Sequence, residues 1–184
     1  MRIIGGEYRS RLISMPKGVE IRPTMDKVRQ AVFNILGDVN GASVLELFAG
    51  SGAFGIEAIS RGADHATFVD NNFACIKTIK ANIASLGVNN SKYDIIRTDA
   101  LLVCGRFEKE GKRFDIVFMD PPYYKEIAKK CLISIDTCDI LSRTALVVVE
   151  HFKKDSLPAG LKSLAIEKTR QYADAAITIF RKIS

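Results

Sequence analysis

Short stretches of strand-forming residues recur along the middle of the chain. Each is mostly apolar and five or six residues long, as expected for strands buried on both faces of a parallel sheet. The five stretches are 44–48, 66–70, 93–97, 114–119 and 145–150.

Apolar residues at helical spacing fill several of the intervals between these stretches. Between residues 73 and 86 they recur every three or four positions, and Gly87 follows as a helix stop. A second helix is predicted from the glycine turn to Gly62, and a third from about Lys125. Because strands alternate with helices, the sequence predicts a parallel sheet with helices on both faces.

The beginning of the chain has a different pattern. Residues 2–15 combine β-formers with basic residues around a Gly-Gly pair, which predicts a small hairpin or a bent strand. Thr24 is placed to N-cap a helix with an apolar stripe from Val28 to Leu36, and Gly37 ends it.

The end of the chain predicts a second hairpin. The segments 164–170 and 175–181 are strand-like and only four residues apart, too close for a crossover helix, so they are antiparallel. The predicted fold is α/β and Rossmann-like: a seven-stranded, mostly parallel sheet with a C-terminal antiparallel hairpin and a small N-terminal β-hairpin extension. At 184 residues the chain is one domain, 1–184, with an extension at 1–24 and a core at 25–184.

Positive charge gathers at the two ends of the chain. Of the net +6, residues 1–30 and 151–184 carry +4 each, whereas residues 31–150 carry −2. This distribution suits a domain that grips a polyanion with its periphery, although a solvated basic surface without a partner explains the charges equally well.

Composition excludes several classes. With 47% hydrophobic and 26% charged residues the chain is globular, and no apolar run is longer than that at 145–149, which is far too short to cross a membrane. Arginines stand where a signal peptide needs apolar residues, so secretion is not expected. The four cysteines form no C-x-x-C pair, which predicts free thiols in a reducing cytosol and no metal site.

A glycine-rich loop follows the first predicted strand. Residues 50–55 read G-S-G-A-F-G, and Asp70 lies twenty residues after Gly50 at the end of the next strand. This is the pattern of an adenosine-cofactor site, in which glycines let the backbone approach the ligand and the carboxylate accepts hydrogen bonds from a ribose.

The loop by itself does not choose between NAD and S-adenosylmethionine. Glu46, near the end of the first strand, would repel a pyrophosphate but would favour a sulfonium and an α-amino group. After Glu150 the sequence has too few residues for the substrate domain of a dehydrogenase. Both observations favour S-adenosylmethionine.

The sequence Asp120-Pro121-Pro122-Tyr123 follows the fourth strand, at the edge where open α/β sheets bind ligands. The prolines stiffen the turn, so the Asp120 side chain and the Pro121 carbonyl can both point outward as acceptors. Such a pair matches the two hydrogens of an exocyclic base amine, and Tyr123 can stack on the base. The arrangement predicts methyl transfer to that nitrogen, with Asp120 stabilising the developing charge.

These motifs resemble those of the bacterial RsmD family, class I methyltransferases that modify guanine N2 in small-subunit ribosomal RNA. The specific part is N-terminal, where residues 2–6 read R-I-I-G-G and residues 22–24 read R-P-T. The chain departs from the family pattern at four positions. Glycine is usual where this chain has Ser10 and Ala173, and the other two departures are Glu46 and Met25.

The resemblance implies a role for each matched position. The residues implied to bind the cofactor are Glu46, Phe48, Ala49, Gly50, Ser51, Gly52, Asp70, Asn71, Asp99 and Ala100. The residues implied to bind the target amine are Asp120, Pro121, Pro122 and Tyr123. The residues implied to bind RNA are Arg2, Arg9, Arg11, Arg22 and Thr24. The implied partner is 16S rRNA or a small-subunit assembly particle, without a membrane, and the implied enzyme is cytoplasmic and monomeric.

Other functions remain open at this point. An adenine-N6 methyltransferase acting on DNA or RNA would use the same D-P-P-Y turn, and so would a protein glutamine methyltransferase. A nicotinamide-dependent oxidoreductase would use the same glycine loop. A cofactor-binding RNA chaperone would use the basic ends without catalysis.

Overall fold

All seven strands lie in one sheet, in the order β3-β2-β1-β4-β5-β7-β6. The computed structural model describes residues 1–18, 26–122, 126–158 and 160–183. The strands are β1 (Ser43–Leu47), β2 (His65–Asp70), β3 (Tyr93–Arg97), β4 (Phe114–Met119), β5 (Leu141–Phe152), β6 (Leu164–Tyr172) and β7 (Ala175–Lys182). The first five pair in parallel, and β7 is antiparallel to both β5 and β6. The predicted sheet and its terminal hairpin are confirmed.

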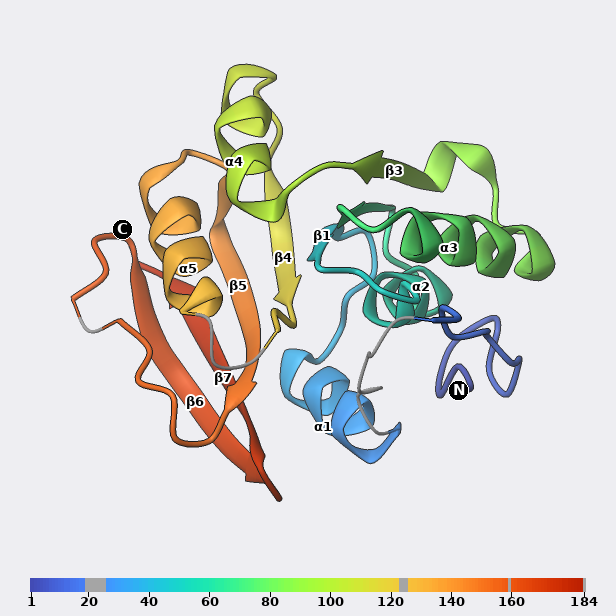
Figure 1. The fold of residues 1–184 in the computed structure, drawn as a ribbon, viewed down its shortest axis with the longest axis horizontal. Helices are drawn as coiled ribbons and strands as arrows, with labels where there is room; N and C mark the ends of the chain where they lie inside the picture. Colours follow the sequence, from blue (N-terminus) through green and yellow to red (C-terminus); the bar gives the residue numbers. More distant parts are fainter. Residues whose placement is uncertain (19–25, 123–125, 159, 184) are drawn as a thin grey trace.

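Helices cover both faces of the sheet (Figure 1). They are α1 (Asp26–Leu36), α2 (Ala53–Ser60), α3 (Phe73–Leu86), α4 (Ala100–Lys109) and α5 (Ile127–Thr137), with a short 3-10 turn at Asn90–Lys92. Val44 of β1 belongs to the core shared with α1, α2 and α3, whereas its neighbour Leu45 belongs to the core shared with α4 and α5. Successive residues of a strand point to opposite faces, so one buried strand serves both cores.

Two elements differ from the sequence prediction. No helix was predicted at α4, although its buried residues Ala100, Val103, Cys104 and Phe107 follow helical spacing. Strand β5 is longer than the predicted 145–150, because it begins at Leu141 beside Phe114 and passes through exposed residues 143–144. Polar, solvent-facing residues carry no apolar signal, so a sequence pattern cannot show that the strand continues through them.

The N-terminal segment forms the predicted small hairpin and is tied firmly to the core. Arg2 and Leu12 form an antiparallel bridge. The backbone N–H groups of Ile4 and Gly5 each donate to the Glu57 carboxylate of α2 at 2.8 Å. This buried carboxylate also pairs with Arg61 at 2.8 Å.

A buried arginine completes the attachment. Arg29 of α1 is fully buried, and its Nε lies 3.6 Å from the Glu57 carboxylate. It also donates a hydrogen bond to the Arg2 carbonyl. Buried charges are tolerated only when they are paired, so Glu57 fixes where the N-terminal hairpin meets α1 and α2.

Two of the departures from the family pattern lie at backbone positions that favour glycine. Ser10 has φ 68° and Ala173, in the turn between β6 and β7, has φ 52°. A side chain in this left-handed region crowds its own backbone. The chain therefore tolerates some strain at both turns.

We expect Ala173→Gly to raise the free energy of unfolding by about 0.5–1 kcal/mol, because relief of the left-handed strain exceeds the entropy that glycine adds to the unfolded chain. Ala165, exposed in the extended backbone of β6, is the matched control. Its replacement by glycine should lower stability by about the same amount. Urea denaturation measures both, and a loss of stability in Ala173→Gly would contradict the strain argument.

Candidate active site

A cleft opens where β1 and β4 end. The two strands are neighbours, with Leu47 opposite Met119, so the residues that follow them emerge at the same edge of the sheet. The cleft is lined by Met1, Met15, Glu46, Leu47, Phe48, Ala49, Gly50, Ser51, Ala53, Phe54, Phe118, Met119 and Asp120. The structure therefore brings Asp120 together with most of the predicted methionine-end residues.

Close packing explains the glycines in the loop. Gly52 has φ 76° and forms the N-cap of α2. A Cβ on Gly55 would lie 2.5 Å from the Phe68 ring and 2.9 Å from the Glu46 carboxylate. Glycine at this position lets the first turn of α2 approach the ends of β1 and β2.

Glu46 accepts hydrogen bonds at the N-terminus of α2. Its two oxygens accept from the N–H groups of Phe54 at 3.1 Å and Gly55 at 2.8 Å. Burial raises the pKa of this carboxyl from 4.5 to about 8, although both hydrogen bonds and nearby Arg29 act in the opposite direction. The sequence predicts Glu46 at the cofactor, but no local pattern shows that its side chain also accepts from the first turn of α2.

This contact bears on the choice of cofactor. In a dinucleotide site the first free N–H groups of the helix bind the pyrophosphate. Here the Glu46 carboxylate already occupies two of them and leaves a buried acidic group beside the cleft. The occupied N–H groups are not available to a pyrophosphate, whereas the positive charge of a cationic amino acid end would favour the ionised form of Glu46 over the neutral form that burial favours.

The predicted ribose and adenine residues lie outside the cleft, at the ends of β2 and β3. One Asp70 oxygen accepts from the Gly50 N–H at 2.9 Å and the other from the Asn72 N–H at 2.8 Å. Asp99 caps α4 by accepting from the Leu101 N–H at 2.8 Å. Asn71 is exposed and Ala100 is buried. An extended ligand in the cleft reaches these positions only by running along the carboxyl edge across β1, β2 and β3.

The turn after β4 borders two hollows. Asp120 lines the cleft, whereas Pro121 and Pro122 line a separate cavity. Pro121 is buried and Pro122 is exposed. Tyr123 lies outside the described residues.

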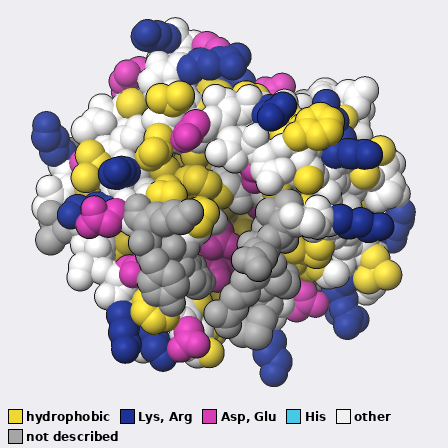
Figure 2. Space-filling model, viewed as in Figure 1, with side chains coloured by type: hydrophobic (Ala, Val, Ile, Leu, Met, Phe, Trp, Pro, Cys, Tyr) yellow, Lys and Arg dark blue, Asp and Glu magenta, His cyan; other side chains and the backbone are white. Residues whose placement is uncertain are grey.

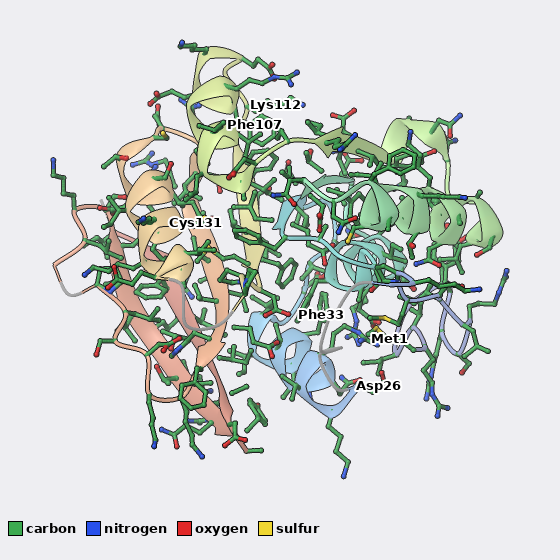
Figure 3. All side chains as sticks on the ribbon, in the orientation of Figure 1. Met1, Asp26, Phe33, Phe107, Lys112 and Cys131 are labelled. Carbon is green, nitrogen blue, oxygen red and sulfur yellow. The ribbon has the colours of Figure 1, made fainter. Side chains whose placement is uncertain are left out.

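The N-terminal segment contributes residues to the cleft that the sequence does not predict. Met1 and Met15 line it together with Phe54 and Phe118. In Figure 3 the labels of Met1, Phe33 and Asp26 lie in the same part of the view, and the Nε of Arg2, next to Met1, lies 3.6 Å from the Asp26 carboxylate of α1. A methionine has no pattern that marks it as a site residue, so only its tertiary position reveals this role.

Asn82 of α3 holds the N-terminal segment against the glycine loop. Its amide nitrogen donates to the carbonyls of Ser14 at 3.0 Å and Ser51 at 2.9 Å, and its oxygen accepts from the Ser14 N–H at 2.8 Å. The side chain is buried. One residue therefore links the hairpin to the loop that forms the cleft.

The predicted RNA contacts that the structure describes are all exposed. Arg9 is exposed at the hairpin, Arg11 donates to the Ser85 carbonyl at 2.8 Å, and Arg2 lies 3.6 Å from Asp26. Arg22 and Thr24, with the predicted helix cap, lie outside the described residues. Figure 2 shows lysine and arginine side chains around the outline and acidic side chains between the two grey stretches.

The described residues contain neither a group of three or more side chains able to hold a metal ion nor a helix long and apolar enough to cross a membrane. The four cysteines are free thiols, and three of them are buried. Burial raises the pKa of Cys75 and Cys131 to about 12, which keeps both thiols protonated at neutral pH.

The raised pKa of Glu46 predicts a pH dependence of stability. A carboxyl with a folded pKa near 8 contributes stability that is complete below its unfolded pKa near 4.5 and is lost as pH rises through 8. We expect Glu46→Gln, which stays neutral, to gain stability relative to the wild type between pH 5 and 9. Denaturant titrations across this range measure the difference, with exposed Glu110→Gln as the control. Parallel curves for wild type and Glu46→Gln would rule out the shift.

Comparison with known proteins agrees with this geometry. The chain is 35% identical to the "Putative rRNA methyltransferase YlbH" of Bacillus subtilis, over 99% of both chains. It is 30% identical to "Ribosomal RNA small subunit methyltransferase D" of Escherichia coli, over 99% of this chain and 90% of that protein. The solved structure of the "Putative methyltransferase yhhF from Escherichia coli" superposes with a TM-score of 0.86 at 29% identity, covering 100% of this chain and 98% of that one. The family model described as "Conserved hypothetical protein 95" matches residues 1–181, and the chain therefore belongs to that family, the RsmD-type methyltransferases.

Proposed function

We propose that this chain transfers a methyl group from S-adenosylmethionine to the N2 amine of a guanine in 16S ribosomal RNA, either free or in a small-subunit assembly particle. The observation that carries the proposal is the position of Asp120, which lines one cleft with Glu46 and the glycine loop. The names of the relatives support ribosomal RNA as the substrate. Family membership argues against the oxidoreductase alternative.

The chain offers matching groups for two parts of the cofactor. Glu46 and residues 48–51 of the glycine loop line the cleft for the amino acid end, and Asp70 stands at the end of β2 for the ribose hydroxyls. Both carboxylates accept backbone hydrogen bonds, which fix their orientation before any ligand arrives. S-adenosylmethionine supplies an activated methyl on a sulfonium sulfur, so the protein's main task is positioning.

The residues after β4 hold the acceptor. The Asp120 carboxylate and the Pro121 carbonyl accept the two hydrogens of the amine, which turns the nitrogen lone pair toward the cleft. As the N–C bond forms and the S–C bond breaks, Asp120 stabilises the positive charge on nitrogen. The alkylated amine then loses a proton to water, and S-adenosylhomocysteine remains in the cleft.

Asp120→Ala should lower kcat for methyl transfer at least ~100-fold, because it removes one acceptor and the charge that stabilises the transition state. Binding of S-adenosylhomocysteine should stay within about threefold of wild type, since the loop and Glu46 are untouched. Asp64→Ala, an exposed aspartate just before β2, is the control. Labelled cofactor with unmodified small-subunit RNA and nucleoside analysis of the product provide the readout. Full activity in Asp120→Ala would refute the mechanism, and methyl-adenine as the product would favour the adenine-N6 alternative.

Arg9→Ala should weaken RNA binding and lower the slope of log K against log salt by about 0.7–0.9, the value for one lost phosphate contact. Arg11 already donates to the Ser85 carbonyl, so Arg9 is the cleaner test. Lys109→Ala, at the end of α4, removes the same charge far from the hairpin along the chain. Titrations of fluorescent RNA at several salt concentrations measure both slopes. Equal salt slopes of RNA binding for the two variants would show that Arg9 of the hairpin does not contact RNA.

A further inference from the structure

A second cavity lies on the other side of the turn that follows β4. Its volume is about 460 Å³, within the range of small-molecule binding sites. Its walls come from the turn, from the start of α5 and from the segment after β5. The lining residues are Pro121, Pro122, Glu126, Ile127, Ala128, Lys129, His151, Lys154, Asp155, Ser156 and Leu157. Asp120 lines the cleft and Pro121 lines this cavity, so adjacent residues join the two hollows.

One wall of the cavity is a buried histidine held by a chain of hydrogen bonds. The Nδ1 of His151 lies 3.0 Å from the Phe152 carbonyl, which can only accept, so Nδ1 carries the proton. Its Nε2 therefore accepts from the Thr178 hydroxyl at 2.9 Å, and Thr178 lies 3.1 Å from the Thr169 hydroxyl. Burial lowers the pKa of His151, which keeps the ring neutral.

This hydrogen-bond chain fixes the position of the wall. It joins β5 to β7 and β7 to β6, directly before the segment that carries Lys154 and Ser156. Both ring nitrogens of His151 form hydrogen bonds within the protein, so the ring forms part of the cavity wall and does not transfer protons. The histidine wall of the cavity is therefore a fixed part of the fold.

The remaining walls combine the groups that recognise a nucleotide. Pro122, Ile127 and Leu157 offer apolar surface against which a base can pack. Lys129 and Lys154 are exposed cations, which suit a phosphate. The carboxylates of Glu126 and Asp155 can accept hydrogen bonds from the ribose and the base edges. The Ser156 hydroxyl can accept or donate such hydrogen bonds. The two lysines and two carboxylates balance in charge, so the cavity favours a whole nucleotide over a bare anion.

The path of a polynucleotide strand leads to the same place. A base whose amine sits between the Asp120 carboxylate and the Pro121 carbonyl belongs to a strand that must leave the site in two directions. The N-terminal segment, with Met1 and Met15, borders the cleft itself. The cavity behind Pro121 is the adjoining space beside the other side of the turn.

We propose that this cavity binds the nucleotide next to the target guanosine in the RNA strand, with Lys129 and Lys154 on its phosphates. The inference rests on the proposed function and adds to it a second subsite of the substrate strand. Through this subsite, recognition extends beyond the methylated base to its neighbour.

A pair of double variants tests the lysines. Lys129→Ala with Lys154→Ala should raise KM for RNA about tenfold or more and lower the salt slope of binding by about 1.4–1.8. The kcat of this double variant and its affinity for S-adenosylhomocysteine should stay within about twofold of wild type. Lys109→Ala with Lys130→Ala is the matched control, because it removes the same charge from α4 and α5 outside the cavity lining.

A second experiment tests the base. RNA that lacks the base on one side of the mapped target should bind wild type more weakly than intact RNA. Ser156→Trp, which fills the cavity, should bind intact RNA about as weakly and show no further loss with the abasic RNA. Such non-additivity is the signature of a shared contact.

The outcomes separate the subsite from the proposed function. If wild type methylates guanine but the two double variants behave alike, or if the abasic penalty is the same in wild type and Ser156→Trp, the subsite is refuted and the function stands. If wild type transfers no methyl to ribosomal RNA guanine, the proposed function fails and the subsite fails with it.

Discussion

The candidate active cleft depends on one buried carboxylate, Glu46, at the end of β1. Its oxygens accept the N–H groups of Phe54 and Gly55, and this contact sets how closely α2 approaches the sheet. Only glycine fits at position 55, because a side chain there would collide with both Glu46 and Phe68. The positions of the glycine loop, of the start of α2 and of the acidic group beside the cleft therefore depend on one another. Glu46 also occupies helix N–H groups that a pyrophosphate would need.

A second buried group, Glu57, attaches the N-terminal hairpin to α2. It accepts the N–H groups of Ile4 and Gly5 and pairs with Arg29 and Arg61. Because the network is buried, removing Glu57 would leave the buried Arg29 with only the partly exposed Asp26 as its ionic partner among the described residues. The hairpin with the exposed arginines is therefore held at a fixed distance from the cleft. The proposed function needs such a fixed relation between the RNA-binding hairpin and the methylating cleft, since small errors in position reduce the rate strongly.

The two halves of the carboxyl edge of the sheet carry different candidate site residues. The ends of β1, β2 and β3 carry Glu46, Asp70 and Asp99, whereas the ends of β4 and β5 carry Asp120 and His151. Open α/β sheets bind ligands at this edge because the loops of adjacent strands converge there. In the proposed function the first half faces the cofactor and the second half faces the RNA strand. The turn at 120–122, between the two hollows, is where they meet.

The sequence by itself determined the order along the chain of the seven strands and of the helices α1, α2, α3 and α5, together with the two motifs, because apolar spacing and glycine-rich turns are local properties of the chain. The sequence prediction lacks α4, although its buried residues follow helical spacing, and it lacks the first residues of β5, where exposed polar residues carry no apolar signal. Only the tertiary structure decided that Met1 and Met15 line the cleft, that Asn82 links the hairpin to the glycine loop, and that Glu46 caps α2. Each of these contacts joins residues that lie apart along the chain, and which of them meet depends on the packing of the whole fold.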